Sequence, residues 1–102
     1  MNEHNRLLTI IVSPDIEEIV VDWLLARDDL PGFSTMPIRG HGERPEAMDL
    51  REQVAGRRGR VMIQSCLSAG TAEAVVDALR AAFPGTGIRY WVAPLEAFGR
   101  LD

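Results

Sequence analysis

The chain of 102 residues contains no lysine, because all eleven of its basic residues are arginine. This absence excludes Schiff-base chemistry and a phosphate-binding loop of the lysine type. Cys66 is the only cysteine, which excludes an internal disulfide and a zinc site built from several thiolates. No apolar run approaches the roughly 18 residues of a membrane span, and the N-terminus lacks the basic start of a signal peptide. We therefore expect a cytoplasmic protein that is not embedded in a membrane.

The composition is that of an ordinary globular protein, with 46% hydrophobic and 25% charged residues in 11.3 kDa. This length predicts a single domain over residues 1–102. The net charge of −4 argues against a general nucleic-acid binder. No nucleophile and base stand at a useful spacing, so we do not expect an enzyme.

The first half of the chain predicts a strand, a helix and a second strand. Residues 7–12 form a short apolar run typical of a buried strand. Ser13 and Pro14 then suit the start of a helix. The apolar face expected for this helix consists of Ile16, Ile19, Val20, Trp23 and Leu24. Residues 33–39 predict a strand that Pro37 restricts to an edge or a bulge.

The second half repeats this pattern in the order strand, helix, strand. Residues 60–67 predict the third strand, and Thr71 is the expected cap of the second helix. The apolar face of that helix is Ala72, Val75, Val76, Leu79 and Phe83. Residues 88–92 predict a last strand whose inward side chains are Ile88, Tyr90 and Val92. The order βαββαβ predicts an α+β, ferredoxin-like fold with an antiparallel sheet.

The segment 40–59 is the most informative part of the sequence. Two strands that pair as a hairpin need only a short connection, and this one is much longer. We therefore expect a long mobile loop over residues 40–59. Six of the eleven arginines fall between residues 39 and 60. Gly40 and Gly42 open this loop, and Gly85 and Gly87 form a second small-residue turn. From the residues alone, both an anion site and a plain solvated loop remain open. The segment has no Tyr, Ser or Thr, which excludes regulation by hydroxyl modification within it.

Metal binding is the weaker alternative. His4, His41 and Cys66 are the only soft or borderline ligands, and they share no local spacing. Cys66 is better explained as a packing residue of the third strand. His41 remains a candidate ligand for a site pooled between subunits.

Three motifs together resemble the PII signalling proteins and their PII-like relatives. Residues 38–44 (IRGHGER) resemble the exit from the second strand into the T-loop of those proteins, and residues 60–63 resemble the returning strand. Gly85-Thr86-Gly87 is similar to the B-loop, which holds phosphates at a subunit boundary. Arg100 lies near the position where a C-terminal arginine reaches the nucleotide. The chain looks closest to small proteobacterial PII-like proteins, some of them associated with heavy-metal efflux systems.

The resemblance implies a homotrimeric regulatory protein with an anionic effector in its inter-subunit clefts. It implies ATP, ADP or AMP as ligand, with bicarbonate as another anion, and a membrane transporter or efflux system as the target of the loop. Arg44 replaces a glutamine that helps PII proteins to bind magnesium and 2-oxoglutarate. The effector residues that it implies are Gly40, Gly42, Arg58, Arg60, Gly85, Gly87, Arg89 and Arg100, and those of the partner-contacting loop are Arg44, Met48, Leu50 and Arg51. The alternatives are a trimeric metal-binding protein of the divalent-cation-tolerance type, for which His41 matters, and an adaptor without ligand.

Overall fold

The computed structural model describes residues 4–42 and 57–102 and contains two helices, one short 3-10 turn and four strands in these parts. In chain order they are β1 (Arg6–Val12), η1 (Pro14–Ile16), α1 (Glu17–Leu25), β2 (Ser34–His41), β3 (Arg57–Leu67), α3 (Ala69–Ala82) and β4 (Arg89–Pro94). The strands form one antiparallel sheet in the order β2-β3-β1-β4. This architecture confirms the α+β, ferredoxin-like prediction. Pro37 lies on β2, which is an edge strand as its proline requires.

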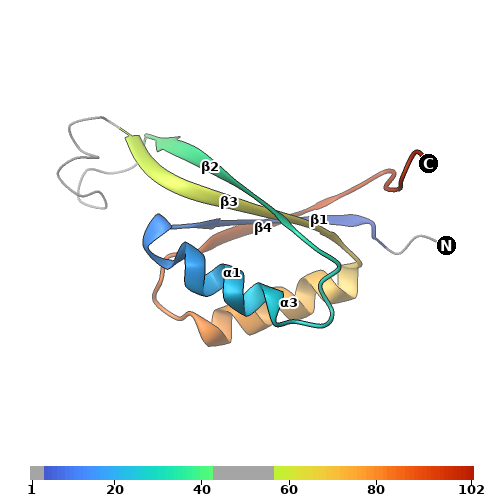
Figure 1. The fold of residues 1–102 in the computed structure, drawn as a ribbon, viewed down its shortest axis with the longest axis horizontal. Coiled ribbons are helices and arrows are strands. Elements are labelled where there is room, and N and C mark those ends of the chain that lie inside the picture. The colour runs from blue at the N-terminus through green and yellow to red at the C-terminus, as the bar shows by residue number, and fades with distance from the viewer. Residues whose placement is uncertain (1–3, 43–56) are drawn as a thin grey trace.

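Both helices lie on the same side of the sheet (Figure 1). Strand alternation separates the two faces, since successive side chains of a strand point to opposite sides. The helix side holds the hydrophobic core, which includes Leu8, Ile10, Val12, Val61, Ile63, Leu67, Val20, Leu24, Ala72, Val75, Val76 and Leu79. The other side has no helix over it in the described part of the chain. We call it the open face, and by alternation it carries Leu7, Thr9, Ile11, Met36, Ile38, Met62, Gln64, Cys66, Trp91 and Ala93.

The apolar stripe of α1 differs from the predicted one at a single position. Val20 and Leu24 are fully buried, but Ile19 is 61% exposed. Successive residues turn by about 100° around a helix, so a stripe centred between Val20 and Leu24 leaves Ile19 beyond its edge. Val21 packs against the core on the other flank instead. The helix also starts later than expected, because Ser13 caps the 3-10 turn and α1 itself begins at Glu17.

The second helix has the predicted apolar face but a different cap. Ser68, not Thr71, is the N-cap, and its Oγ accepts a hydrogen bond from the Thr71 backbone N–H at 3.1 Å. Thr71 therefore lies within the first turn, where its Oγ1 accepts a hydrogen bond from Ser68 Oγ at 2.9 Å. Both residue types can cap a helix, and the backbone conformation at Ser68 decided between them.

The ends of the two helices are joined by an aromatic contact. Trp23 of α1 and Phe83, just after α3, meet edge to face with ring centroids 5.7 Å apart. The Arg27 guanidinium lies 5.1 Å from the Trp23 ring centroid and also forms two hydrogen bonds to the Asp29 carboxylate, at 2.8 and 2.9 Å. These hydrogen bonds from Arg27 hold the pKa of Asp29 below its usual value. The Trp23–Phe83 ring contact thus joins α1 to the end of α3 at the edge of the core.

Candidate functional site

The strand register brings most of the predicted effector residues to one end of the sheet. Val12, the last residue of β1, pairs with Val61, and Ile11 pairs with Arg89 at the start of β4. On the other side of β3, Ile38 pairs with Arg60 and Gly40 with Arg58. The end of β2, the start of β3, the end of β1 and the start of β4 therefore lie together, on the left of Figure 1. We call this the loop end of the sheet.

The base of the long connection is a regular β-hairpin rather than loop. The predicted loop began at Gly40 and ended at Gly59, but β2 runs on to His41 and β3 starts at Arg57. Gly40 is paired with Arg58, and His41 with Arg57. The strands are longer than predicted because Gly and Arg residues, poor as strand signals, still extend a ladder that has a partner strand beside it. Gly42 then leaves the strand with a φ of 79°, a conformation that favours glycine.

The turn between α3 and β4 supplies the second part of the site. Gly85 and Gly87 have φ values of 74° and 72°, and Thr86 between them donates a hydrogen bond from Oγ1 to the carbonyl of Phe83 at 2.7 Å. A Cβ at either glycine would meet nothing within 4 Å, so the left-handed backbone and not crowding requires glycine here. Turns of this kind, with residues in the left-handed region, present backbone N–H groups that can bind anions.

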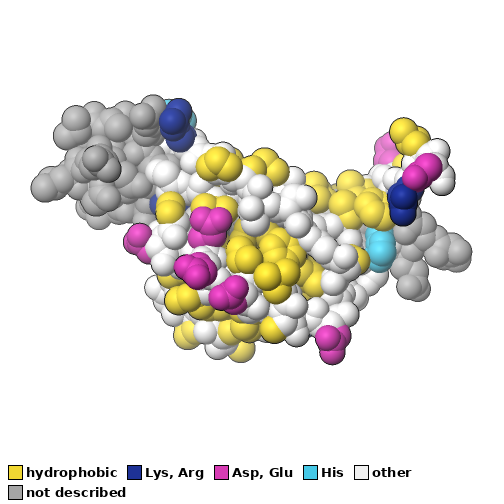
Figure 2. Space-filling view, viewed as in Figure 1, with side chains coloured by type: hydrophobic (Ala, Val, Ile, Leu, Met, Phe, Trp, Pro, Cys, Tyr) yellow, Lys and Arg dark blue, Asp and Glu magenta, His cyan; other side chains and the backbone are white. Residues whose placement is uncertain are grey.

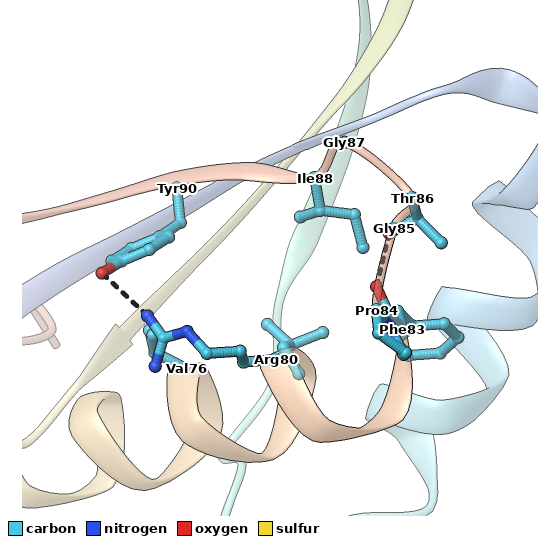
Figure 3. A pocket seen from close by; sticks show the side chains of 10 residues that line it. Val76, Arg80, Phe83, Pro84, Gly85, Thr86, Gly87, Ile88 and Tyr90 are labelled. Carbon is cyan, nitrogen blue, oxygen red and sulfur yellow. Dashed lines mark hydrogen bonds between the residues drawn. The ribbon is translucent and has the colours of Figure 1, made fainter.

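A cavity of about 210 Å³ lies beside this turn, between α3 and β4 (Figure 3). Leu79, Phe83, Pro84 and Ile88 give it apolar walls, and the Gly85–Gly87 turn closes one end. Arg80 crosses the opening and donates a hydrogen bond from Nη2 to the Tyr90 hydroxyl at 3.4 Å (Figure 3). The predicted site did not include Arg80 or Tyr90. Their only sequence signal was that they stand on either side of the two-glycine turn.

The arginines of the loop end differ in their exposure. Arg39 and Arg89 are exposed, whereas Arg60 is only 9% exposed and donates from Nη1 to the carbonyl of Gly59 at 2.8 Å. A buried guanidinium is costly unless it is hydrogen-bonded, so part of the role of Arg60 is structural. The exposed Arg89, next to the turn, is the better placed of the two for a charge-assisted bond to a ligand. Several acidic side chains lie nearby over α1 (Figure 2), where Glu17 and Glu18 occupy its first turn.

Arg100 is the predicted effector residue that one protomer does not bring to this site. The segment after β4 leaves the sheet at its other end, where Leu95 N–H donates to the carbonyl of Asn5 at 3.0 Å. Arg100 lines a hollow there together with His4, Cys66 and Phe98, and its guanidinium pairs with Asp102 at 2.9 Å. Within one protomer, Arg100 therefore lies at the opposite end of the sheet from the other predicted effector residues.

The remaining predicted residues divide into two groups. Arg44, Met48, Leu50 and Arg51, the expected partner-contacting residues, lie outside the described residues. His41, the candidate metal ligand, is exposed at the end of β2, far along the sheet from the hollow that His4 and Cys66 line. Over residues 4–42 and 57–102, no group of three or more His, Cys, Asp or Glu side chains is placed to hold a metal ion.

Comparison with known proteins assigns the family. The family model of DUF3240, described as a protein of unknown function, matches residues 3–102, and the chain belongs to this family. A crystal structure of a DUF3240 family protein from Shewanella baltica is 26% identical, with a TM-score of 0.77 and coverage of 100% of both chains. No curated protein matches.

A second structure connects this fold to the PII-like proteins. It is that of a protein from Thermus thermophilus assigned to PII-like signalling, with 20% identity, a TM-score of 0.61 and coverage of 87% of this chain and 83% of that one. The resemblance to PII-like proteins, first seen in three short motifs, is thereby confirmed at the level of the fold. In the described part of the chain, no helix is long and apolar enough to cross a membrane.

Proposed function

We propose that the protein is a PII-like regulatory module that binds a small anionic effector at the loop end of the sheet. The observation that carries this proposal is the register, which gathers Gly40, Arg58, Arg60 and Arg89 at the end where the Gly85–Gly87 turn lies. Backbone N–H groups and guanidinium groups are the donors that bind phosphate or carboxylate. An adenine nucleotide is the first candidate, and bicarbonate is the second.

The active form in this proposal is a homotrimer. The open face supports it, because this face of the sheet carries Met36, Met62 and Trp91 and no helix covers it within the described residues. Met36 and Trp91 are 38% and 46% exposed in the single protomer. Association through this face would also allow Arg100 of one copy to approach the loop end of another. The site then takes part of its charge from a partner subunit.

In this scheme the effector passes its signal through the connection between β2 and β3. The two strands that carry the connection also carry effector residues, so a bound anion acts directly at its base. Signalling requires that the effector bind two arrangements of the connection with different affinity. The target would be another protein, with a membrane transporter or efflux system as the first candidate.

Calorimetric titration with ATP, ADP and AMP, with and without magnesium, tests the effector. We expect saturable binding by the wild-type protein and a loss of about tenfold or more in Arg89→Ala, because a charge-assisted bond contributes about 1.5–3 kcal/mol. Arg27→Ala is the matched control, since Arg27 follows α1 at the other end of that helix and should leave binding unchanged. Equal affinity in Arg89→Ala and the wild type would remove Arg89 from the site.

The same titration separates the alternatives. A protein that ignores all three nucleotides but binds bicarbonate retains the anion site with another effector. Binding of a divalent metal that is lost in His41→Ala would favour the metal-binding alternative. A protein that binds none of these ligands would contradict the effector proposal and leave the adaptor.

A further inference from the structure

A second feature of the molecule adjoins the two-glycine turn of the loop-end site and runs along the free edge of β4. This strand is an edge of the sheet, and its helix-side residues Tyr90 and Val92 are 47% and 40% exposed although the sequence predicted them to point inward. They are exposed because α3 does not close over the edge. Besides the cavity beside the two-glycine turn, a second cavity of about 360 Å³ lies there, and the two share Val76, Arg80 and Tyr90. They form one groove between α3 and β4.

The alternation of hydrogen-bonded pairs between β1 and β4 determines which backbone groups of β4 point to its free edge. Leu95 N–H donates to the Asn5 carbonyl, and the register continues that pairing through Leu7 with Ala93. Bonded pairs alternate in an antiparallel ladder, so every second residue of β4 bonds to β1 and the residues between point away from it. The backbone N–H and C=O groups of Tyr90 and Val92 therefore point to the free edge. Pro94 is the next outward residue and lacks an N–H, which limits the usable edge to a short segment.

An added strand would place its side chains directly into the groove. Residues opposite Tyr90 and Val92 would have their side chains on the same face as these two, which is the side of α3. One side chain would reach the smaller cavity, whose walls are mainly apolar. The side chain two positions further along the added strand would reach the larger cavity. That cavity is polar and is lined by charges of both signs, from Arg6, Glu73, Asp77 and Arg80. Edge pairing with alternate side-chain pockets is an established mode of peptide recognition.

We propose that the groove between α3 and β4 binds a short extended segment of a partner protein, added as a strand to β4. The segment carries an apolar residue and a polar residue two positions apart. Its length is short because Pro94 ends the edge, which disfavours a whole strand of a second copy as the occupant. This proposal does not depend on the effector, and it is tested in the absence of nucleotide.

The probe is a library of random heptapeptides displayed on phage and selected on the full-length protein. We expect enriched peptides with an apolar and a polar residue two positions apart. A synthetic, fluorescein-labelled form of an enriched peptide should lose at least tenfold in affinity on Val92→Pro, which removes an edge N–H that bonds to nothing within the described sheet. Val92→Ala keeps that N–H and is the matched control. Circular dichroism verifies that both variants fold.

Two further measurements distinguish strand addition from other modes of binding. N-methylation along the peptide should abolish binding only at alternate positions, and the amides of Tyr90 and Val92 should gain protection from hydrogen exchange when peptide is added. The proposal is overturned by a selection that enriches nothing, by equal affinity of the proline variant, or by an N-methyl profile without alternation. It is also overturned when both amides are already protected without peptide, because a second copy of the chain then covers the edge.

Discussion

Gly85 and Gly87 show at the scale of single residues how a backbone angle limits the choice of amino acid. Neither glycine is in a crowded place, yet both have φ values above 70°. Such a conformation costs an ordinary L residue about 1–2 kcal/mol, because its Cβ approaches the following carbonyl oxygen. The motif that suggested an anion site is therefore also a requirement of the turn itself.

Gly87→Ala should destabilise the protein by about 1–2 kcal/mol, because the left-handed conformation is unfavourable for alanine. For a domain of this size that corresponds to a fall in melting temperature of about 4–8 °C per kcal/mol, measurable by calorimetry. Gly70→Ala is the control, since Gly70 lies in the first turn of α3 without a left-handed φ and has nothing within 4 Å of its Cβ position. That variant should be neutral or stabilised by up to about 1 kcal/mol. Similar melting temperatures for the two variants would contradict the left-handed backbone conformation at Gly87.

At the scale of an element, helix α1 shows that the apolar face predicted from helical spacing can differ from the face that is buried. The rule selected five apolar residues at helical spacing, and the core accepted four of them to some degree. Ile19 is exposed because the helix is rotated so that Val20 and Leu24 face the sheet. The exact rotation of a helix depends on what it packs against, which its own sequence does not contain.

Leu24→Ala should lower the free energy of unfolding by about 2–5 kcal/mol, because it removes buried atoms and leaves a cavity. Ile19→Ala should change it by less than about 0.5 kcal/mol, as expected of a surface position. Urea unfolding at one fixed protein concentration measures both, because the stability of an associating protein depends on its concentration. Comparable losses for the two variants would show that Ile19 is covered in solution, for example by a partner.

The open face matters at the scale of the whole molecule. The two helices use only one side of the sheet, and the other side carries apolar side chains from all four strands. Large exposed apolar patches generally mark interaction surfaces. The trimer that we propose buries this face and leaves the helices and the groove along β4 on the outside.

Light scattering tests the assembly. We expect the wild-type protein at about three times the mass of the chain and Trp91→Glu at the mass of one chain, because the substitution puts a charge into the buried face. Leu25→Glu is the control, since Leu25 is 67% exposed on α1 and outside the proposed interface. A trimer that survives Trp91→Glu would place the interface elsewhere on the molecule.

The sequence by itself determined the order of elements, the fold class and the family resemblance. These depend on local signals, such as the apolar runs, the helical spacing of α3 and the two-glycine turn, which are all readable within a few residues. The end of the sheet at which the predicted glycines and arginines gather follows from that order and from the direction of the strands.

Only the tertiary structure decided the rest. The continuation of β2 to His41 and of β3 back to Arg57 depends on each strand having the other as a partner. The burial of Arg60, the exposure of Ile19 and the position of Arg100 away from the other effector residues depend on long-range packing. The groove along β4 exists because α3 stops short of the sheet edge, a distance between two elements that no local pattern encodes.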